Sequence, residues 1–336
     1  MKIYKSSCIA GAFIATILLP PAALGSMSGE LTLQHSPDLE SWTDVEITGE
    51  MLDEEGRLVL TGLPAPSFFR LEVTGFAVTP TPADMALVEG GTLSTSNALD
   101  GTEVDSFHIG RYEVTWGEWQ AVQAWGEAHG YEWPSAADHA SGRDPSGCAD
   151  DHPVYAVNWY DVVKWGNAKS EMEGLTPVYT VDGEVYRSGE FGWDGSHAVE
   201  QNLSATGYRL PMEAEWEFAA RGGNHSQDHT YSGSNDLDAV GWYWDNSGGA
   251  ACDLSSGHGT WPVGQKAANE LGLYDMSGNV WEWCWDQSGS YFRRFRGGSW
   301  YLPADLCTVS VRNARNPSSR NTNYIGFRLA RSTTGQ

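Results

Sequence analysis

Hydrophobic and polar positions follow two different periods along this chain. Between residues 27 and 76, the runs GRLVLTGL and SFFRLEVTG are rich in Val, Leu and Phe and predict a small all-β module. Two prolines break the pattern in TPTPAD, so residues 77–84 are predicted to form a linker. Residues 85–331 predict one larger domain, whose first half has helical periodicity.

Three stretches of the larger domain predict helices. In TWGEWQAVQAWGEAHG, Thr115 is placed to cap the helix and Glu118 to complete a capping box. VNWYDVVKWGNAKSEMEG predicts a second helix that ends at Gly174. The third, in GYRLPMEAEWEFAARGG, has Pro211 at its start and the Gly222–Gly223 pair at its end. The remainder has no long helical period and predicts short strands joined by long ordered loops, which together with the helices indicates an α+β fold.

The N-terminus has the pattern of a secretory signal. Lys2 and Lys5 precede the apolar run CIAGAFIATILL, and the small-residue site Ala23–Gly25 follows it. Residues 1–25 are therefore predicted to be a signal peptide, whose apolar run is too short to span a bilayer comfortably. Ser26, not cysteine, comes next, which argues against a lipoprotein anchor. We expect a secreted or periplasmic protein with no membrane insertion after signal cleavage.

Composition narrows the possible partners. The 336 residues carry 44 acidic and 20 basic side chains, a formal net charge of −24. Such a charge makes nucleic acid and anionic membrane surfaces poor partners. Sixteen Trp and 39 Gly favour a loop-rich fold in which aromatic side chains fill much of the core.

Six runs of the larger domain carry a family resemblance. In chain order they are FHIGRYEVTWGEWQAV, HPVYAVNWYDVVKWGNA, GYRLPMEAEWEFAARGG, NELGLYDMSGNVWEW, RRFRGGSW and IGFRLAR, and they cover roughly residues 85–331. Together they resemble the formylglycine-generating enzyme family, also called sulfatase-modifying factors. The resemblance implies a variant of the C-type-lectin-like fold, with few regular elements, much irregular structure and often calcium.

The resemblance also locates a catalytic site. In the family's active enzymes, two cysteines just after a Gly-Gly-Ser turn hold copper(I), and oxygen converts a sulfatase cysteine to formylglycine. Cys307 matches the second cysteine, but Leu302 stands at the first position and cannot ligate copper. Ser299 and Trp283 match positions that line the oxygen pocket. The resemblance thus implies a remnant pocket in which copper is not expected, or a Gly297–Gly298 turn that only defines the fold.

Four cysteines lie beyond the predicted signal peptide: Cys148, Cys252, Cys284 and Cys307. An even number in an exported protein favours disulfides. Three alternatives are open for Cys307. It could pair with Cys284, leaving Cys148 to pair with Cys252, it could be a buried free thiol, or it could form a displaced copper pair with Cys284.

Two loops match calcium-binding loops of the family, DNSGG at 245–249 and SGNVWEW at 277–283. The candidate ligands are Asn279, the Val280 carbonyl, Glu282, Asn246 and Ser247, with Asp253 as a possible acidic ligand downstream. Calcium prefers several oxygen ligands, including carboxylates and carbonyls, so a structural calcium is predicted. The alternative is that these side chains only close the loops by hydrogen bonding.

Three functions follow from these observations. The first is an exported sulfatase-modifying-factor family protein that lacks the two-cysteine copper chemistry and binds a peptide, glycan or protein ligand. The alternative is a formylglycine-generating oxidase that acts on a sulfatase cysteine. The third is a structural or adhesion module, which the N-terminal β module would support, although a C-type-lectin-like fold does not by itself imply sugar binding.

Overall fold

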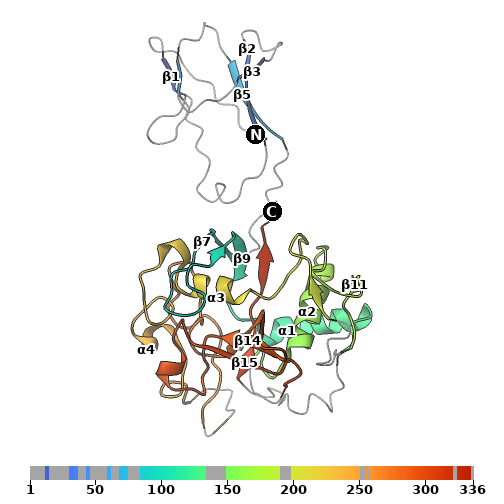
Figure 1. Ribbon diagram of the computed structural model, residues 1–336, viewed down its shortest axis with the longest axis vertical. Helices are drawn as coiled ribbons and strands as arrows, with labels where there is room; N and C mark the ends of the chain where they lie inside the picture. The colour runs from blue at the N-terminus through green and yellow to red at the C-terminus, as the bar shows by residue number, and fades with distance from the viewer. Residues whose placement is uncertain are drawn as a thin grey trace. The chain divides into compact units, whose positions relative to one another are not determined.

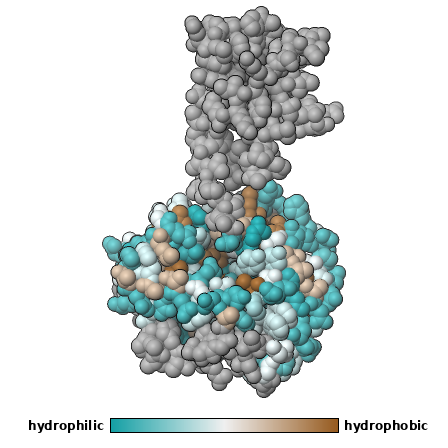
Figure 2. Space-filling model, turned by 180° about the vertical axis from the view of Figure 1, so that it is seen from behind, coloured by the Kyte–Doolittle hydropathy of each residue, from teal (hydrophilic) through white to brown (hydrophobic). Residues whose placement is uncertain are grey.

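The computed structural model describes residues 84–133, 149–189, 198–249, 255, 257–320 and 324–333, together with the backbone of five strands nearer the N-terminus. The chain divides into two compact units, Met1–Pro80 and Thr81–Gln336. Within the described residues, no helix is long and apolar enough to cross a membrane. Figure 2 shows one face of the second unit, where hydrophilic residues predominate and hydrophobic ones are scattered.

The described backbone of the first unit is extended. Strand β2 (Glu30–Ser36) is central, with β3 (Thr43–Val45) on one edge and β5 (Phe68–Thr74) on the other, all antiparallel. Strands β1 (Ala12–Ile14) and β4 (Val59–Thr61) form a separate antiparallel pair.

Two helices of the second unit lie side by side in Figure 1. Helix α1 (Trp116–Ala128) has the predicted capping box, since Thr115 Oγ1 accepts from Glu118 N and the Glu118 carboxylate accepts from Thr115 N. Helix α2 (Trp159–Met172) begins after Asn158, whose side chain accepts from Asp161 N. The chain leaves α2 at Gly174, whose φ of +73° explains the glycine there. Both predicted helices are confirmed.

The third predicted helix is also confirmed, with a later start. Helix α3 (Glu213–Ala220) begins two residues after Pro211, and the Glu215 carboxylate accepts from Met212 N in place of a side-chain cap at residue 212. Gly222, with φ of +93°, ends the helix and leads into the short 3₁₀ turn η4 (Gly223–His225). The last short helices are α4 (Leu237–Val240) and the 3₁₀ turn η5 (Ala304–Leu306).

Two sheets organise the second unit. The four-stranded sheet has the order β15-β14-β13-β16, formed by β13 (Trp281–Ser288), β14 (Phe292–Arg296), β15 (Arg312–Arg315) and β16 (Ile325–Gly326). Only β16 runs parallel to its neighbour, β13. The three-stranded sheet has the order β17-β9-β6, formed by β6 (Met85–Val88), β9 (Phe107–Gly110) and β17 (Ala330–Ser332). It therefore joins the first and last strands of the unit.

Smaller strands complete the unit. They are β7 (Gly91–Thr92) with β8 (Glu103–Val104), and β10 (Tyr179–Val181) between β11 (Glu184–Val185) and β12 (Glu200–Gln201). Tight turns join β10 to β11 and β13 to β14, while long irregular segments connect many of the other elements, as the α+β prediction expects.

Aromatic side chains fill much of the core. Among the largest fully buried side chains are Trp159, Trp165, Trp216, Trp283 and Trp300. The Trp165 ring stacks on Trp119 with ring centroids 5.8 Å apart, and both rings meet Phe327 edge-on. Each large ring removes more apolar surface from water than an aliphatic side chain does, so the described part of the unit holds together with few helices.

Candidate functional site

The Gly-Gly-Ser turn follows strand β14 directly. Gly297 and Gly298 have φ angles of +98° and +78°, which other residues rarely adopt. A Cβ at Gly298 would lie 2.6 Å from Cys307 Sγ and 2.6 Å from Leu306 O. Glycine is thus needed at position 298 for two reasons: it adopts the positive φ angle, and it leaves room for the Cys307 segment.

The turn is tied to the SGNVWEW loop by backbone hydrogen bonds. Gly278 N donates to Gly297 O at 2.8 Å, and Trp300 N donates to Asn279 O at 2.8 Å. Ser299 lies between these bonds, fully buried, and its Oγ has no hydrogen-bond partner among the described residues. The structure thus places a buried hydroxyl at the position that the resemblance assigns to the oxygen pocket.

Cys307 lies against this turn as a buried free thiol. Its Sγ donates to Ser299 O at 3.8 Å, and burial raises the pKa of the thiol to about 12. Leu302 packs against the same hydrophobic cluster as Cys307, together with Leu237 and Val240. An apolar side chain therefore occupies the position at which the family's active enzymes have their first cysteine.

Cys284 does not pair with Cys307. It is a buried free thiol on β13, packed in a different cluster that includes Trp216 and Met276. Of the three alternatives for Cys307, the free thiol therefore holds, and the disulfide with Cys284 is wrong. Neither Cys284 nor Leu302 gives Cys307 a second thiolate beside it, so the residues here do not fit a two-cysteine copper site. Cys148 and Cys252 lie outside the described residues.

Trp283 also belongs to the core. It is fully buried on β13, its Nε1 donates to Val157 O at 3.0 Å, and its ring meets Phe295 edge-on. These contacts explain the residue structurally, and its predicted role in an oxygen pocket stays a prediction.

Glu282, the predicted acidic calcium ligand, is bound to a buried arginine. Arg328 Nε lies 2.6 Å from Glu282 Oε2, and Arg328 Nη2 lies 2.7 Å from Oε1. Trp216 Nε1 donates to the same Oε2 at 2.6 Å. The carboxylate is thus fully engaged by protein donors.

Asn279 is engaged in the same way. Its φ is +52°, its Nδ2 donates to Glu113 Oε2 at 2.7 Å, and its Oδ1 accepts from Trp261 N at 3.1 Å. Val280 N donates to Glu113 Oε1 at 2.9 Å. The loop is therefore closed by a carboxylate from a distant segment.

In the weaker calcium loop, Asn246 Oδ1 accepts from Tyr243 N at 2.9 Å, and Ser247 Oγ donates to Trp300 O at 3.0 Å. Asp253 lies outside the described residues. The described residues contain no group of three or more His, Cys, Asp or Glu side chains that could hold a metal ion. As they lie here, the candidate side chains do not fit calcium, and the calcium prediction is one that a chelator must test.

Sequence reasoning missed a buried cluster of carboxylates around Arg328. It consists of Glu113, Asp275 and Glu282, all buried. Burial raises the pKa of Asp275 to about 6 and raises that of Glu113 well above its usual range, with the neighbouring carboxylates adding to both shifts. Asp275 Oδ2 accepts from Gly264 N, while Oδ1 has no hydrogen-bond partner in the described part of the chain. No local motif could reveal the whole cluster, because Glu113 and Arg328 lie far along the chain from Asp275 and Glu282.

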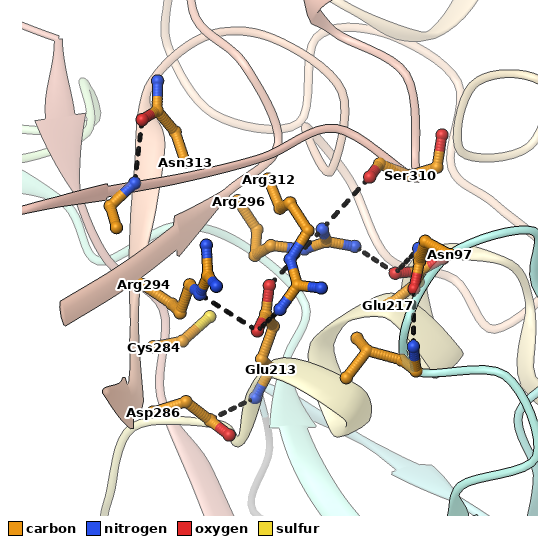
Figure 3. Close-up of polar contacts among 12 residues, drawn as sticks. Asn97, Glu213, Glu217, Cys284, Asp286, Arg294, Arg296, Ser310, Arg312 and Asn313 are labelled. Carbon is orange, nitrogen blue, oxygen red and sulfur yellow. Dashed lines mark hydrogen bonds and ion pairs between the residues drawn. The ribbon is translucent and has the colours of Figure 1, made fainter. Parts of the chain in front are cut away.

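A second buried network explains the arginines before the turn (Figure 3). Helix α3 supplies Glu213 and Glu217, and strands β14 and β15 supply Arg294, Arg296 and Arg312. Arg296 donates to Glu217, while Glu213 forms ion pairs with Arg294 and Arg312. The run RRFR is thus largely structural, since it fastens the sheet to α3.

Aromatic side chains, of which three are partly buried and one is exposed, lie next to the turn. His258, Trp244, Tyr301 and Tyr324 form a continuous series of ring contacts, here called the aromatic ladder. Trp244 stacks on His258 at 4.1 Å, meets Tyr301 at 5.6 Å with the planes at 89°, and Tyr301 stacks on Tyr324 at 5.8 Å. Tyr301 is 46% exposed. Trp244 N also donates to Leu302 O at 2.9 Å, which ties the ladder to the candidate site.

Comparison of the sequence with known protein families gives a match that fits the fold and the Gly-Gly-Ser turn. The chain belongs to the sulfatase-modifying factor enzyme 1-like family, whose domain matches residues 72–333. This confirms the family to which the six sequence runs pointed.

Known relatives differ in what they do. The chain is 38% identical over 270 residues to the chaperone protein LppX of Paenibacillus barcinonensis, covering 72% of this chain and 86% of that protein. It is 37% identical over 136 residues to the inactive C-alpha-formylglycine-generating enzyme 2 of Mus musculus, covering 38% of this chain and 44% of that protein. It is 28% identical over 236 residues to the formylglycine-generating enzyme of Streptomyces coelicolor, covering 61% of this chain and 62% of that enzyme.

Solved structures share the fold. CarF superimposes with a TM-score of 0.60 and 32% identity, covering 76% of this chain and all of that one. The Treponema denticola variable protein 1 superimposes with a TM-score of 0.57 and 32% identity, covering 74% of this chain and 95% of that one. The fold prediction is therefore confirmed.

Proposed function

We propose that the chain is an exported, divergent member of its family that binds a ligand near the Gly-Gly-Ser turn and does not oxidise cysteine with copper. The ligand is a peptide, a glycan or another protein. The N-terminal residues that suggest export lie outside the fully described part of the chain, so export belongs to the proposal.

The buried thiol of Cys307 beside Leu302 carries this proposal. Copper(I) binds soft thiolates, and the thiolate rather than the thiol is the ligand. Burial raises the pKa of the Cys307 thiol, which disfavours the thiolate form. Leu302, at the other ligand position, offers no donor atom.

Among the three ligand classes, similarity to the chaperone LppX favours a polypeptide. That alignment covers most of both chains, whereas the alignment with the inactive mouse enzyme covers less than half of either. A protein that binds other exported polypeptides needs no redox metal. A structural or adhesion role for the N-terminal unit stays a prediction.

The second candidate is the formylglycine-generating oxidase. Similarity to the Streptomyces enzyme favours it, as does the unpartnered Ser299 hydroxyl at the position of the oxygen pocket. For this activity another group would have to complete the metal site in place of Leu302.

The deciding experiment is a mass-spectrometric assay of the purified protein. The protein is given copper(I), oxygen, a thiol reductant and a peptide with a Cys-x-Pro-x-Arg motif, with an active family member as positive control. We expect the peptide cysteine to stay unmodified while circular dichroism shows a folded protein. Formylglycine in the peptide would overturn the proposal in favour of the oxidase.

Leu302→Cys is the companion variant. It restores two cysteines at the positions that the family's active enzymes use. We expect it to gain copper(I) binding, measured by competition with a chromophoric chelator, while the same substitution at the exposed Leu203 has no such effect. If Leu302→Cys does not bind copper(I), the cleft has diverged by more than one residue.

A further inference from the structure

Elsewhere in the described residues, several aromatic rings have a lysine or arginine side chain of the same protein over their faces. Lys266 Nζ lies 4.0 Å from the Trp242 ring centroid, and the Arg293 guanidinium lies 3.8 Å from that of Trp159. A cation over a ring face is attracted by the negative face of the π system. The protein therefore uses this interaction repeatedly within its own fold.

The aromatic ladder differs in this respect. Among the described residues, no Lys or Arg lies over Trp244, Tyr301 or Tyr324. Tyr301 nevertheless has nearly half of its surface exposed, and its ring meets that of Trp244 edge to face. The ladder is thus a group of aromatic rings, one of them exposed, over which the described residues place no lysine or arginine side chain.

Carboxylates lie beside the ladder. Asp245 follows Trp244 and is exposed, and Asp305 is exposed in the η5 turn. Burial raises the pKa of Tyr243, and the Asp238 and Asp245 carboxylates raise it further, which places their negative charge at this side of the molecule. Tyr243 and Leu302 pack on the same hydrophobic cluster, so this charge lies close to the ladder.

These features point to one kind of ligand. We propose that the aromatic ladder binds an organic cation, either a free quaternary ammonium compound or the ammonium or guanidinium side chain of a basic polypeptide. The ring faces supply the attraction at short range, and the carboxylates and the net charge of −24 draw a cation toward the site. The inference rests on the proposed binding role and names the chemistry of its ligand.

Two titrations test the two sources of the cation. Choline is compared with 3,3-dimethylbutan-1-ol, its uncharged analogue of the same shape, and a short oligolysine peptide is compared with oligoglutamate. Binding is followed by calorimetry and tryptophan fluorescence at pH 8, above the usual titration range of imidazole, with sodium chloride at matched ionic strength.

Three variants locate the binding. Tyr301→Ala removes an exposed ring and should weaken cation binding about fivefold or more, whereas Tyr301→Phe keeps the ring and should retain binding. Phe292→Ala is the matched control, because Phe292 is 47% exposed on β14, outside the ladder. It should leave binding unchanged.

The outcomes are distinct. Saturable binding of choline but not of its neutral analogue supports a free ammonium ligand, and binding of oligolysine alone supports a polypeptide. The inference is overturned if neither cation binds the folded protein, if the neutral analogue binds equally well, or if Tyr301→Ala binds as the wild type does. Formylglycine in the oxidase assay would instead overturn the proposed function and leave these titrations standing.

Discussion

Arg328 and Glu282 form an ion pair in which both side chains are fully buried, with Nε–Oε2 and Nη2–Oε1 distances of 2.6 and 2.7 Å. The pair joins β13 to the segment that leads into β17. Arg328 Nη2 also donates to Tyr274 O and its Nη1 to Gly110 O, so the guanidinium connects two further segments. A charge placed so deeply is tolerated only while its partner is present.

We therefore expect Glu282→Gln to lower the free energy of unfolding by about 3–5 kcal/mol, because Arg328 would stay buried without a counter-charge. Urea denaturation followed by fluorescence measures the loss. Glu173→Gln is the control, since Glu173 pairs with Lys169 at 2.8 Å but its side chain is 39% exposed. That change should cost about 1 kcal/mol or less. Equal losses from the two variants would contradict the assignment of Glu282 as the buried partner.

Asp275 should make stability depend on pH in the direction opposite to most carboxylates. Its folded pKa of about 6 lies above the usual value of 3.8, because burial favours the protonated form. The folded state then binds its proton more tightly than the unfolded state does. The resulting stabilisation is complete below about pH 4 and is lost as pH rises through about 6.

Asp275→Asn removes this titration and keeps an oxygen that can accept from Gly264 N. We expect the variant to gain stability relative to the wild type as pH rises from about 4 to about 6, by up to about 3 kcal/mol. Urea denaturation across this pH range measures the difference between the two proteins. A constant difference would show that Asp275 does not titrate in this window.

The helices could be predicted because their signals are local. The Thr115 capping box and the glycine at 174 act within one helical turn, and both occur where the pattern places them. Aromatic filling of the core could likewise be expected from composition, although composition cannot say which rings meet. The family runs located the Gly-Gly-Ser turn for the same reason, since each run is a contiguous motif.

The polar core could not be predicted in this way. Asn279 and Glu113 are hydrogen-bonded across 166 positions of sequence, and Arg328 reaches Glu282 from the segment between β16 and β17. The calcium prediction for SGNVWEW gave no sign that the Glu282 carboxylate pairs with Arg328 in the fold. Which buried cation neutralises a carboxylate depends on tertiary packing, which no local pattern encodes.

Calcium binding at the SGNVWEW loop can be tested directly. Because Glu282 and Asn279 are held by protein donors, we expect EGTA to leave the melting temperature unchanged in differential scanning fluorimetry. The resemblance alone predicts the reverse, a fall on chelation that calcium restores and magnesium does not. Such a fall would show that the loop rearranges around a metal ion, with the Arg328 pair opened.

The last prediction concerns the Gly-Gly-Ser turn itself. At Gly298 an alanine would have to adopt φ of +78° and place its Cβ 2.6 Å from both Cys307 Sγ and Leu306 O. Backbone strain of about 1–2 kcal/mol would then add to a steric clash of about 1–3 kcal/mol. We expect Gly298→Ala to lower the free energy of unfolding by about 3 kcal/mol or more, measured by urea denaturation.

Gly289→Ala separates these two contributions. Gly289 has φ of +63° in the turn between β13 and β14, and a Cβ there would meet nothing within 4 Å. In the control, the free energy of unfolding should therefore fall only by the backbone strain, about 1–2 kcal/mol. If both variants lose the same amount, Cys307 does not pack against the turn as described, and the argument that its thiol is closed to copper loses its structural basis. If Gly298→Ala alone is severe, the turn and the cysteine form one packed unit, in which a metal could enter only by displacing the Cys307 segment.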